Sequence, residues 1–315
     1  MKAIFKLNKY LRKFTTIKIR HKLELFDKLV LPILNYGCET WGFHSGNALE
    51  RVHLQFCKQL LGVKKCTQND FIYGELGRTP LQNFRLYTVI KYWIKILHSD
   101  DKRYIKIIYN TLYQDLIAKP NSINWVSLLR DLLFRLGFPE VWFSQTVGDD
   151  KLFLNLVKQR IHDQFLQHWQ GRLENSSRAI FYSRIANFRL QPYLDILNVT
   201  KIRNSLARLR LSSHRLCIET GRWTKPISTP LIDRKCTFCT ILEDEYHFVM
   251  ECSLYIELRK NYLPSYYIRR PNMYKFIELI NSENASIIIK LATFVYKAFA
   301  LRSDILFNNT VGAQT

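Results

Sequence analysis

The sequence contains few of the residues that interrupt regular structure. Glycine and proline number 11 and 9 among 315 residues, and no internal repeat or low-complexity tract stands out. Disordered chains are poor in apolar residues, whereas hydrophobic residues make up 47% of this chain and aromatic residues 14%. We therefore expect a globular protein with a substantial core, arranged as one large domain or two of ordinary size.

A long apolar run is also missing. The longest one, residues 287–301, is interrupted by Lys290 and Lys297, and it is shorter than the ~20 residues that a membrane-spanning helix needs. This pattern is typical of a buried amphipathic helix, so we expect no membrane protein.

Signals for secretion are absent as well. Residues 1–20 are basic throughout and contain no apolar run ahead of a cleavage site. The seven cysteines are an odd number, which does not suit a framework of disulfides. These features favour an intracellular location, in the nucleus or the cytoplasm, over secretion.

Acidic residues are scarce. Asp and Glu total 26 against 47 Lys and Arg, which gives a net charge of +21 and a pI of about 9.7. Such a surplus attracts polyanions, so RNA or DNA is the expected partner; a basic protein without a specific partner is the alternative. The most one-sided stretch outside the N-terminus is residues 201–235, whose only acidic members are Glu219 and Asp233.

Motifs for catalysis are lacking too. The sequence has no nucleophile elbow, no zinc-protease helix and no phosphate-binding loop. Polymerases hold two metal ions with aspartates on adjacent strands, and neither Asp100-Asp101 nor Asp149-Asp150 has the flanking alternation of a strand. We therefore expect no enzyme, no catalytic residue and no small-molecule substrate.

Helical periodicity, in contrast, is present along most of the chain. Apolar residues recur at spacings of three and four, which predicts a mainly α-helical fold. Pro32 should kink or end the first helix, and the polar stretch 171–178 is a candidate linker. The predicted helices cover residues 23–33, 49–60, 86–97, 125–136, 152–169 and 202–209.

The clearest site signal is a group of cysteines with one histidine. Cys236 and Cys239 form a C-x2-C pair, and His247 and Cys252 follow. Four such ligands complete a tetrahedron around one ion and leave no open position, as in structural zinc sites. The sequence therefore predicts one bound Zn²⁺, with Cys217 as the only substitute ligand. Ordinary buried cysteines and a surface histidine are the alternative.

The spacing of the last two ligands sets a geometric condition. His247 and Cys252 are five residues apart, or about 140° around a regular helix, so irregular backbone is expected between them. The acidic residues Glu243, Asp244 and Glu245 suit a helix N-terminus, and one of them is a candidate partner for the second ring N–H of His247.

An arginine-rich segment precedes this site. Its side chains are candidates for binding backbone phosphates, and Trp223 is a candidate for stacking on an unpaired base, with packing around the zinc turn as the alternative. The predicted nucleic-acid-binding residues are Arg203, Arg208, Arg210, Arg215, Arg222 and Trp223.

Several stretches together form a recognisable combination. Around the cysteines these are Leu206–His214, Ile218–Trp223, Arg234–Cys239 and Glu243–Phe248. Toward the N-terminus they are Leu25–Asp27, Leu31–Gly37, Glu39–Gly42, Arg51–Cys57 and Tyr73–Arg78. They resemble the C-terminal, thumb-side and zinc-binding region of the reverse transcriptases of non-long-terminal-repeat (LINE-type) retrotransposons. Members of that family carry the polymerase palm, with its catalytic aspartates, ahead of the part that begins here.

The resemblance implies a fragment of an RNA-directed DNA polymerase, from a truncated or degraded copy, without polymerase activity of its own. It implies a thumb-like helical segment (residues 1–65), a helical connector (66–175) and a basic zinc-binding C-terminal domain (176–315), a small lobe stapled by zinc. The role that the resemblance implies is binding of template RNA or target DNA. The alternative is a structural or protein-interaction helical module whose zinc is only a staple. The oligomeric state is left open.

Overall fold

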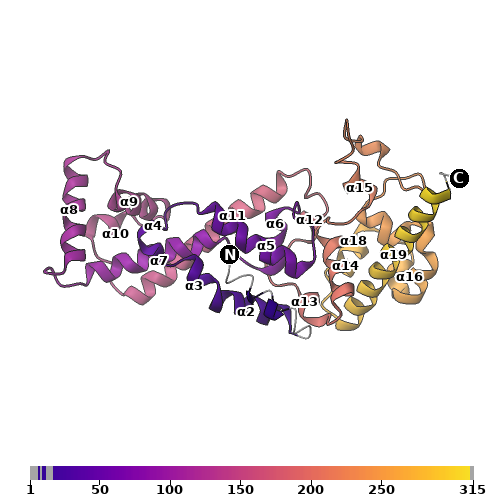
Figure 1. Ribbon diagram of the computed structural model, residues 1–315, viewed down its shortest axis with the longest axis horizontal. Coiled ribbons are helices and arrows are strands. Elements are labelled where there is room, and N and C mark those ends of the chain that lie inside the picture. Colours follow the sequence, from indigo (N-terminus) through magenta and orange to yellow (C-terminus); the bar gives the residue numbers. More distant parts are fainter. Residues whose placement is uncertain (1–5, 8, 12–16, 313–315) are drawn as a thin grey trace. The chain divides into compact units, whose positions relative to one another are not determined.

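The computed structural model describes residues 6–7, 9–11 and 17–312, with side chains up to Leu306, and these residues are mainly α-helical (Figure 1). The predicted fold class is therefore confirmed. Within the described residues, the only β-type pairings are two isolated bridges, Leu76 with Leu190 and Lys235 with Leu242.

The chain divides into two compact units. The first comprises Phe26–His53 and Thr79–Gly171, and the second the described parts of Lys2–Leu25, Leu54–Arg78 and Arg172–Thr315. This division differs from the three consecutive segments expected from the sequence. Residues 54–78 belong with the C-terminal part, as the Leu76–Leu190 bridge illustrates.

The helices that begin before residue 79 are short, apart from two. The first of these two ends at Leu29, three residues before Pro32. Pro32 itself lies in the first turn of the next helix, so the first helix does end near this proline, as predicted. The helices are α2 (Ile19–Leu29), α3 (Leu31–Leu34), α4 (Cys38–Trp41), α5 (Asn47–Leu61) and α6 (Asn69–Leu76).

The core of the first unit lies between helices of residues 81–161. Val89, Ile90 and Trp93 are fully buried there, and the indole of Trp93 donates a hydrogen bond to the Tyr109 hydroxyl at 2.9 Å. The helices are α7 (Leu81–Leu97), α8 (Tyr104–Ala118), α9 (Trp125–Arg135), α10 (Pro139–Ser144) and α11 (Asp150–Glu174). Because α11 continues to Glu174, the linker predicted to start at residue 171 begins later than expected.

The second unit is built around α14 and the C-terminal helix α19, which pack along each other (Figure 1). Its other elements are short. The helices are α12 (Tyr182–Ile185), α13 (Pro192–Ile196), α14 (Thr200–Arg210), α15 (Cys217–Thr220), η1 (Leu231–Asp233), η2 (His247–Glu251), η3 (Ser253–Tyr255), α16 (Ile256–Tyr262), α17 (Ser265–Ile268), α18 (Met273–Ile280) and α19 (Ala285–Gly312).

The predicted C-terminal helix is present and largely buried along one face. No single helix of the described residues has both the length and the apolar character to cross a membrane. By length and composition, α18 and residues 285–306 pass that test only as a pair, bent by 106° at the break between them.

A candidate metal centre

The Cys236–Cys239 pair lies on a tight turn that its own backbone closes. The amide of Cys236 donates to the carbonyl of Ile241 at 2.7 Å, and the amide of Thr240 donates to the carbonyl of Cys236 at 3.0 Å. Lys235 and Leu242 pair as a bridge at the base of the turn. This closure is what directs two thiols, three residues apart, toward the same point.

His247 and Cys252 are brought together by a widened helical turn. Residues 247–251 form a π-helix, η2, and the amide of Cys252 donates to the carbonyl of His247 five residues back, at 2.8 Å. The carboxylate of Asp244 accepts from the amide of His247 at 2.7 Å and so caps the start of this turn. The irregular backbone expected between the two ligands is therefore present, and it supplies the alignment that a regular helix denies them.

The four ligand atoms lie at the separations of a metal tetrahedron. The Sγ atom of Cys252 is 3.9 Å from that of Cys236 and 3.8 Å from that of Cys239. All four ligand atoms, including a ring nitrogen of His247, lie within 4.8 Å of one another. A tetrahedron with metal–sulfur bonds of about 2.3 Å has edges of about 3.8 Å. The group can therefore hold a metal ion with little rearrangement.

The imidazole of His247 is buried and lacks hydrogen bonds. Among the described residues neither of its ring nitrogens has a hydrogen-bond partner, although the residue is only 3% exposed. Burial lowers the pKa of this histidine, which favours the neutral form that binds metals. A buried polar group without a partner is costly, and a metal ion would satisfy one of these two nitrogens.

Among the described residues, the ring of His247 does not donate the expected hydrogen bond to a carboxylate of the acidic trio. The carboxylates of Glu243 and Glu245 are engaged elsewhere, and Asp244 caps the backbone instead. The acidic group near the ring is Glu251, whose Oε2 atom lies 3.9 Å from Nδ1 of His247. Glu251 was not considered from the sequence, and its spacing of four residues from His247 is the signal that points to it.

Neighbouring groups favour a thiolate at Cys239, whereas burial raises the pKa of Cys252 to about 12. Burial raises the pKa of the Cys239 thiol, but hydrogen bonds from the hydroxyl and the amide of Ser253 outweigh it, so the pKa falls below its usual value. The buried guanidinium of Arg259 donates to the carbonyl of Cys252. Its positive charge offsets the negative charge that three thiolates around a divalent ion leave over.

Glu243 and Glu245 connect the centre to the rest of the second unit. Arg302 of α19 contacts Glu243 with two nitrogens, at 2.8 and 2.7 Å. Glu245 accepts from Ser212 at 2.8 Å and lies 2.9 Å from the His214 ring, in the turn that follows α14. These buried carboxylates tie the cysteine turn to α14 and α19.

Two of the six predicted nucleic-acid-binding residues lie inside the protein. Arg210 is 1% exposed and forms an ion pair with Glu75, and Arg203 is 4% exposed and donates to the carbonyl of Leu197. Their guanidinium groups are committed to internal partners. The sequence pattern indicates their burial, because Arg203 and Arg210 are seven residues apart and share a helical face with the buried Leu206.

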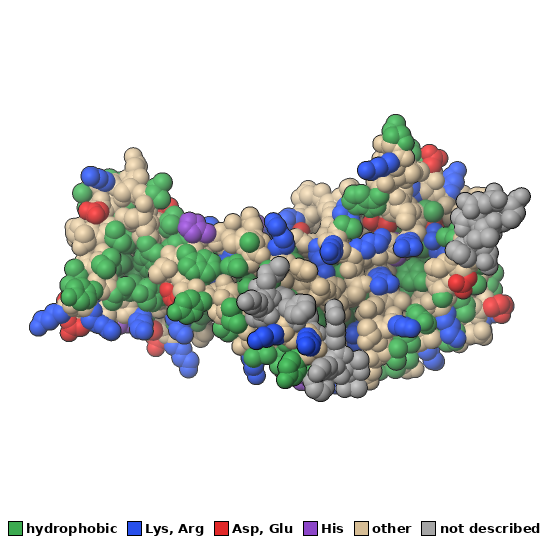
Figure 2. Space-filling model, in the orientation of Figure 1, with side chains coloured by type: hydrophobic (Ala, Val, Ile, Leu, Met, Phe, Trp, Pro, Cys, Tyr) green, Lys and Arg blue, Asp and Glu red, His purple; other side chains and the backbone are tan. Residues whose placement is uncertain are grey.

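The other four predicted residues reach the surface. Arg208 and Arg215 are exposed, and Trp223 is 58% exposed with the guanidinium of Arg178 5.2 Å from its ring centre. Arg222 is half-buried and donates to Glu219 at 3.0 Å. Figure 2 shows Lys and Arg side chains gathered on the face over α14 and its neighbours, with few acidic side chains among them.

The segment that carries Arg222 and Trp223 is held by the cysteine turn itself. The amide of Ile218 donates to the carbonyl of Glu243 at 3.1 Å, and Arg234 donates to the carbonyl of Ile218 at 3.0 Å. The residues that flank the cysteine turn therefore position this part of the basic surface.

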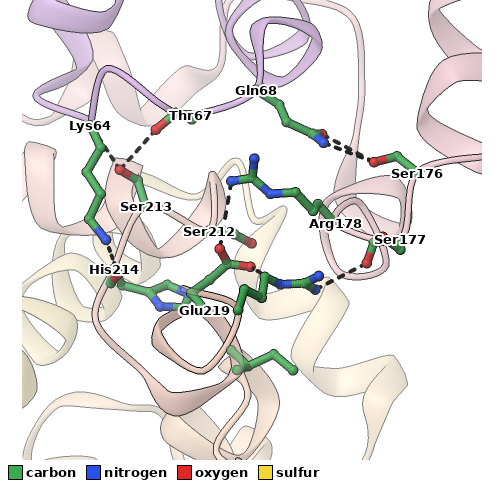
Figure 3. A network of polar contacts seen from close by, with 12 residues as sticks. Lys64, Thr67, Gln68, Ser176, Ser177, Arg178, Ser212, Ser213, His214 and Glu219 are labelled. Carbon is green, nitrogen blue, oxygen red and sulfur yellow. Dashed lines mark hydrogen bonds and ion pairs between the residues drawn. The ribbon is translucent and has the colours of Figure 1, made fainter. Parts of the chain in front are cut away.

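Two further cations of this surface were not predicted. Lys64 reaches the backbone of His214, and Arg178 lies beside Glu219 (Figure 3). Both are far from the arginine-rich segment in sequence, so only folding brings them to it. In the sequence, only the adjacent pair Lys64-Lys65 pointed to one of them.

The chain matches no protein-family model, no curated protein and no solved structure.

Proposed function

We propose that this protein binds nucleic acid and that one structural Zn²⁺ organises the segment which does so. Three sulfurs and one imidazole in a closed tetrahedral set favour zinc, because it prefers these ligands at this geometry. The observation that carries the proposal is the pair of sulfur–sulfur distances, 3.8 and 3.9 Å, in a turn whose flanking residues hydrogen-bond the segment before Arg222 and Trp223.

The electrostatic part of the proposal rests on the surface cations. Arg208, Arg215 and Arg222 can reach phosphates, while Trp223 offers an exposed ring on which an unpaired base can stack. The net charge of +21 adds a long-range attraction to any polyanion. RNA and single-stranded DNA supply both the phosphates and the unpaired bases.

The resemblance of the sequence supplies a biological setting. We infer that the chain corresponds to the thumb-side and zinc-binding region of a LINE-type reverse transcriptase. In that setting it grips template RNA or target DNA and performs no chemistry itself.

Salt dependence tests the proposal. The logarithm of the affinity for a fluorescent single-stranded oligonucleotide should fall linearly with the logarithm of salt concentration. Replacing Arg208 and Arg215 together by Gln should reduce that slope by about 1.4, or about 0.7 for each phosphate of a single strand that is no longer bound. The matched control is Lys91→Gln with Lys95→Gln, two exposed lysines of α7 in the first unit. Affinity that is indifferent to salt would overturn the proposal.

One observation favours a second candidate function, a protein-interaction module stapled by zinc. The loop between Trp223 and the cysteine turn exposes apolar side chains, with Ile227 at 80%, Leu231 at 52% and Ile232 at 75%. Exposed apolar groups of this kind mark protein interfaces. Nucleic-acid binding that survives the Arg208 and Arg215 replacement unchanged would favour this second function.

A further inference from the structure

A basic hollow in the second unit lies apart from the metal ligands. Three segments line it: the turn after α5 with Lys64, the end of α14 with Arg208 and the following turn with Arg215, and α19 with Arg302. Its volume is about 420 Å³, within the range of ~300–1,000 Å³ that is usual for small-molecule sites.

The lining is positively charged, and three of its four cations lack an acidic partner among the described residues. None of the described residues that line the hollow is Asp or Glu. Of its four Lys and Arg residues, Arg302 is paired with Glu243, whereas Lys64, Arg208 and Arg215 have no acidic partner among the described residues. Three such cations around one concavity raise the local attraction for an anion.

Two of these cations, Lys64 and Arg208, are held in place by hydrogen bonds to backbone. Lys64 donates from its Nζ atom to the carbonyl of His214 at 2.7 Å, and Arg208 donates from Nε to the carbonyl of Gly62 at 2.7 Å. Figure 3 shows Lys64 reaching across to His214. An ammonium has three N–H donors and a guanidinium five, so both groups retain donors for a ligand. Fixing them beforehand lowers the entropy lost on binding.

The remaining lining distinguishes the ligand from a simple ion. Ser205 and Ser303 add hydroxyl groups, while Val63, Leu216 and Phe299 add apolar surface. Phosphate alone has no use for the apolar part, but a phosphate ester of a nucleoside uses both. We propose that the hollow binds a phosphate group carried by a nucleotide, either free or at the end of a strand. The nucleotide site and the proposed function share Arg208 and Arg215. The inference depends on the proposed function in no other respect.

Calorimetric titration of the full, zinc-loaded chain tests the hollow. Adenosine 5′-monophosphate should bind at one site, at least about tenfold more tightly than adenosine, because adenosine cannot form the charged hydrogen bonds that the phosphate accepts. Lys64→Gln and Arg215→Gln should each weaken that binding about tenfold. Lys201→Gln, which removes one charge from exposed α14 surface outside the hollow, should change it less than about twofold.

Arg215→Gln keeps the test informative if the Lys64 variant unfolds, because no hydrogen bond of Arg215 occurs among the described residues. Equal affinity for adenosine and its monophosphate, or an equal loss in Lys201→Gln, overturns the inference. Preference for a 5′-phosphorylated over an unphosphorylated oligonucleotide, lost in Lys64→Gln, identifies a strand end as the ligand. Absence of that preference, with the monophosphate bound, identifies a free nucleotide.

The two proposals fail separately. If the chain binds strands in a salt-dependent way but does not bind the monophosphate, the nucleotide site in the hollow is refuted and the proposed function stands. If it binds the monophosphate but shows no salt-dependent strand binding, the proposed function is refuted and the nucleotide site stands.

Discussion

Arg210 and Glu75 form an ion pair that is closed off from solvent, with Nε of the arginine 2.7 Å from Oε1 of the glutamate. The two residues are 135 positions apart in the sequence. The same guanidinium donates to the carbonyl of Ile280 at 2.7 Å and to the side chain of Gln191 at 3.2 Å. One buried cation therefore joins α6, α14, α18 and the residue before α13.

Removing the acid of this pair should destabilise the second unit strongly. Glu75→Ala leaves Arg210 buried without its counter-charge, which costs about 3–5 kcal/mol of unfolding free energy. The control is Glu283→Ala, which breaks the exposed pair with Arg189 and should cost less than about 1 kcal/mol. Urea unfolding measures both. Similar losses in the two variants would show that burial of the Arg210 pair is not what matters.

The backbone at Gly77 should not accept a side chain. Its φ is +61°, and a Cβ atom there would lie 2.8 Å from backbone atoms of Arg189 and Leu190. Gly77→Ala should therefore cost about 3 kcal/mol, from the unfavourable φ and the overlap together. Gly137→Ala isolates the effect of φ, since φ is +82° but the space is open, and should cost about 1 kcal/mol. Thermal unfolding compares the variants; a Gly77 loss no larger than that at Gly137 contradicts the overlap.

Metal analysis of the purified chain should find one equivalent of zinc. Cys239→Ser should abolish it, whereas Cys66→Ser, at an exposed cysteine outside the cluster, should retain it. Because binding and folding are coupled, a chelator should also speed hydrogen exchange in residues 234–255. Full zinc retention in Cys239→Ser would refute this ligand set.

Trp223 should contribute to binding of unpaired strands without affecting the metal. Stacking on an aromatic ring contributes about 1–3 kcal/mol per base, so Trp223→Ala should weaken oligonucleotide binding about fivefold or more. Ile227→Ala, which truncates an apolar side chain 80% exposed in the same loop, is the control. Equal effects of the two changes would mean that the loop contributes apolar surface rather than a stacking ring.

The first unit should lose stability in alkali because of Tyr109. Burial raises the pKa of this tyrosine from 10.0 to about 12. A raised pKa favours the protonated phenol in the folded state, so its contribution is complete below pH 10 and is lost between pH 10 and about 12. Tyr109→Phe should flatten that part of the stability profile, while Tyr104→Phe, at a residue 85% exposed, should leave it unchanged. A profile of the same shape in Tyr109→Phe rules out this assignment.

Local pattern was enough to predict several of the helices and the cluster of three cysteines and one histidine, although it missed α8 (Tyr104–Ala118). The stripe from Leu86 to Leu97 lies within α7, and the spacing from Cys236 to Cys252 identified a cluster whose atoms do converge. Both features depend on residues near one another in sequence, where periodicity and turn geometry are informative.

Long-range partners were beyond such reasoning. An arginine in a basic run looks alike in sequence whether it faces solvent, as Arg208 does, or a buried acid, as Arg210 does. The distinction depends on Glu75, which lies in an apolar helix far upstream. The grouping of residues 54–78 with the C-terminal part is a long-range feature of the same kind, because these residues pack with segments more than a hundred residues later.

The widened turn η2 also determines how the third and fourth ligands can be spaced. One residue inserted into a regular helix rotates everything beyond it by about 100°, which would turn a ligand away from its ion. Here the extra residue is absorbed, since the amide of Cys252 still reaches the carbonyl of His247 at 2.8 Å. A chain with three residues between these ligands, on an ordinary helical turn, presents the same pair. We therefore expect the centre to tolerate the deletion of one residue at this place, and a search for relatives should allow both spacings.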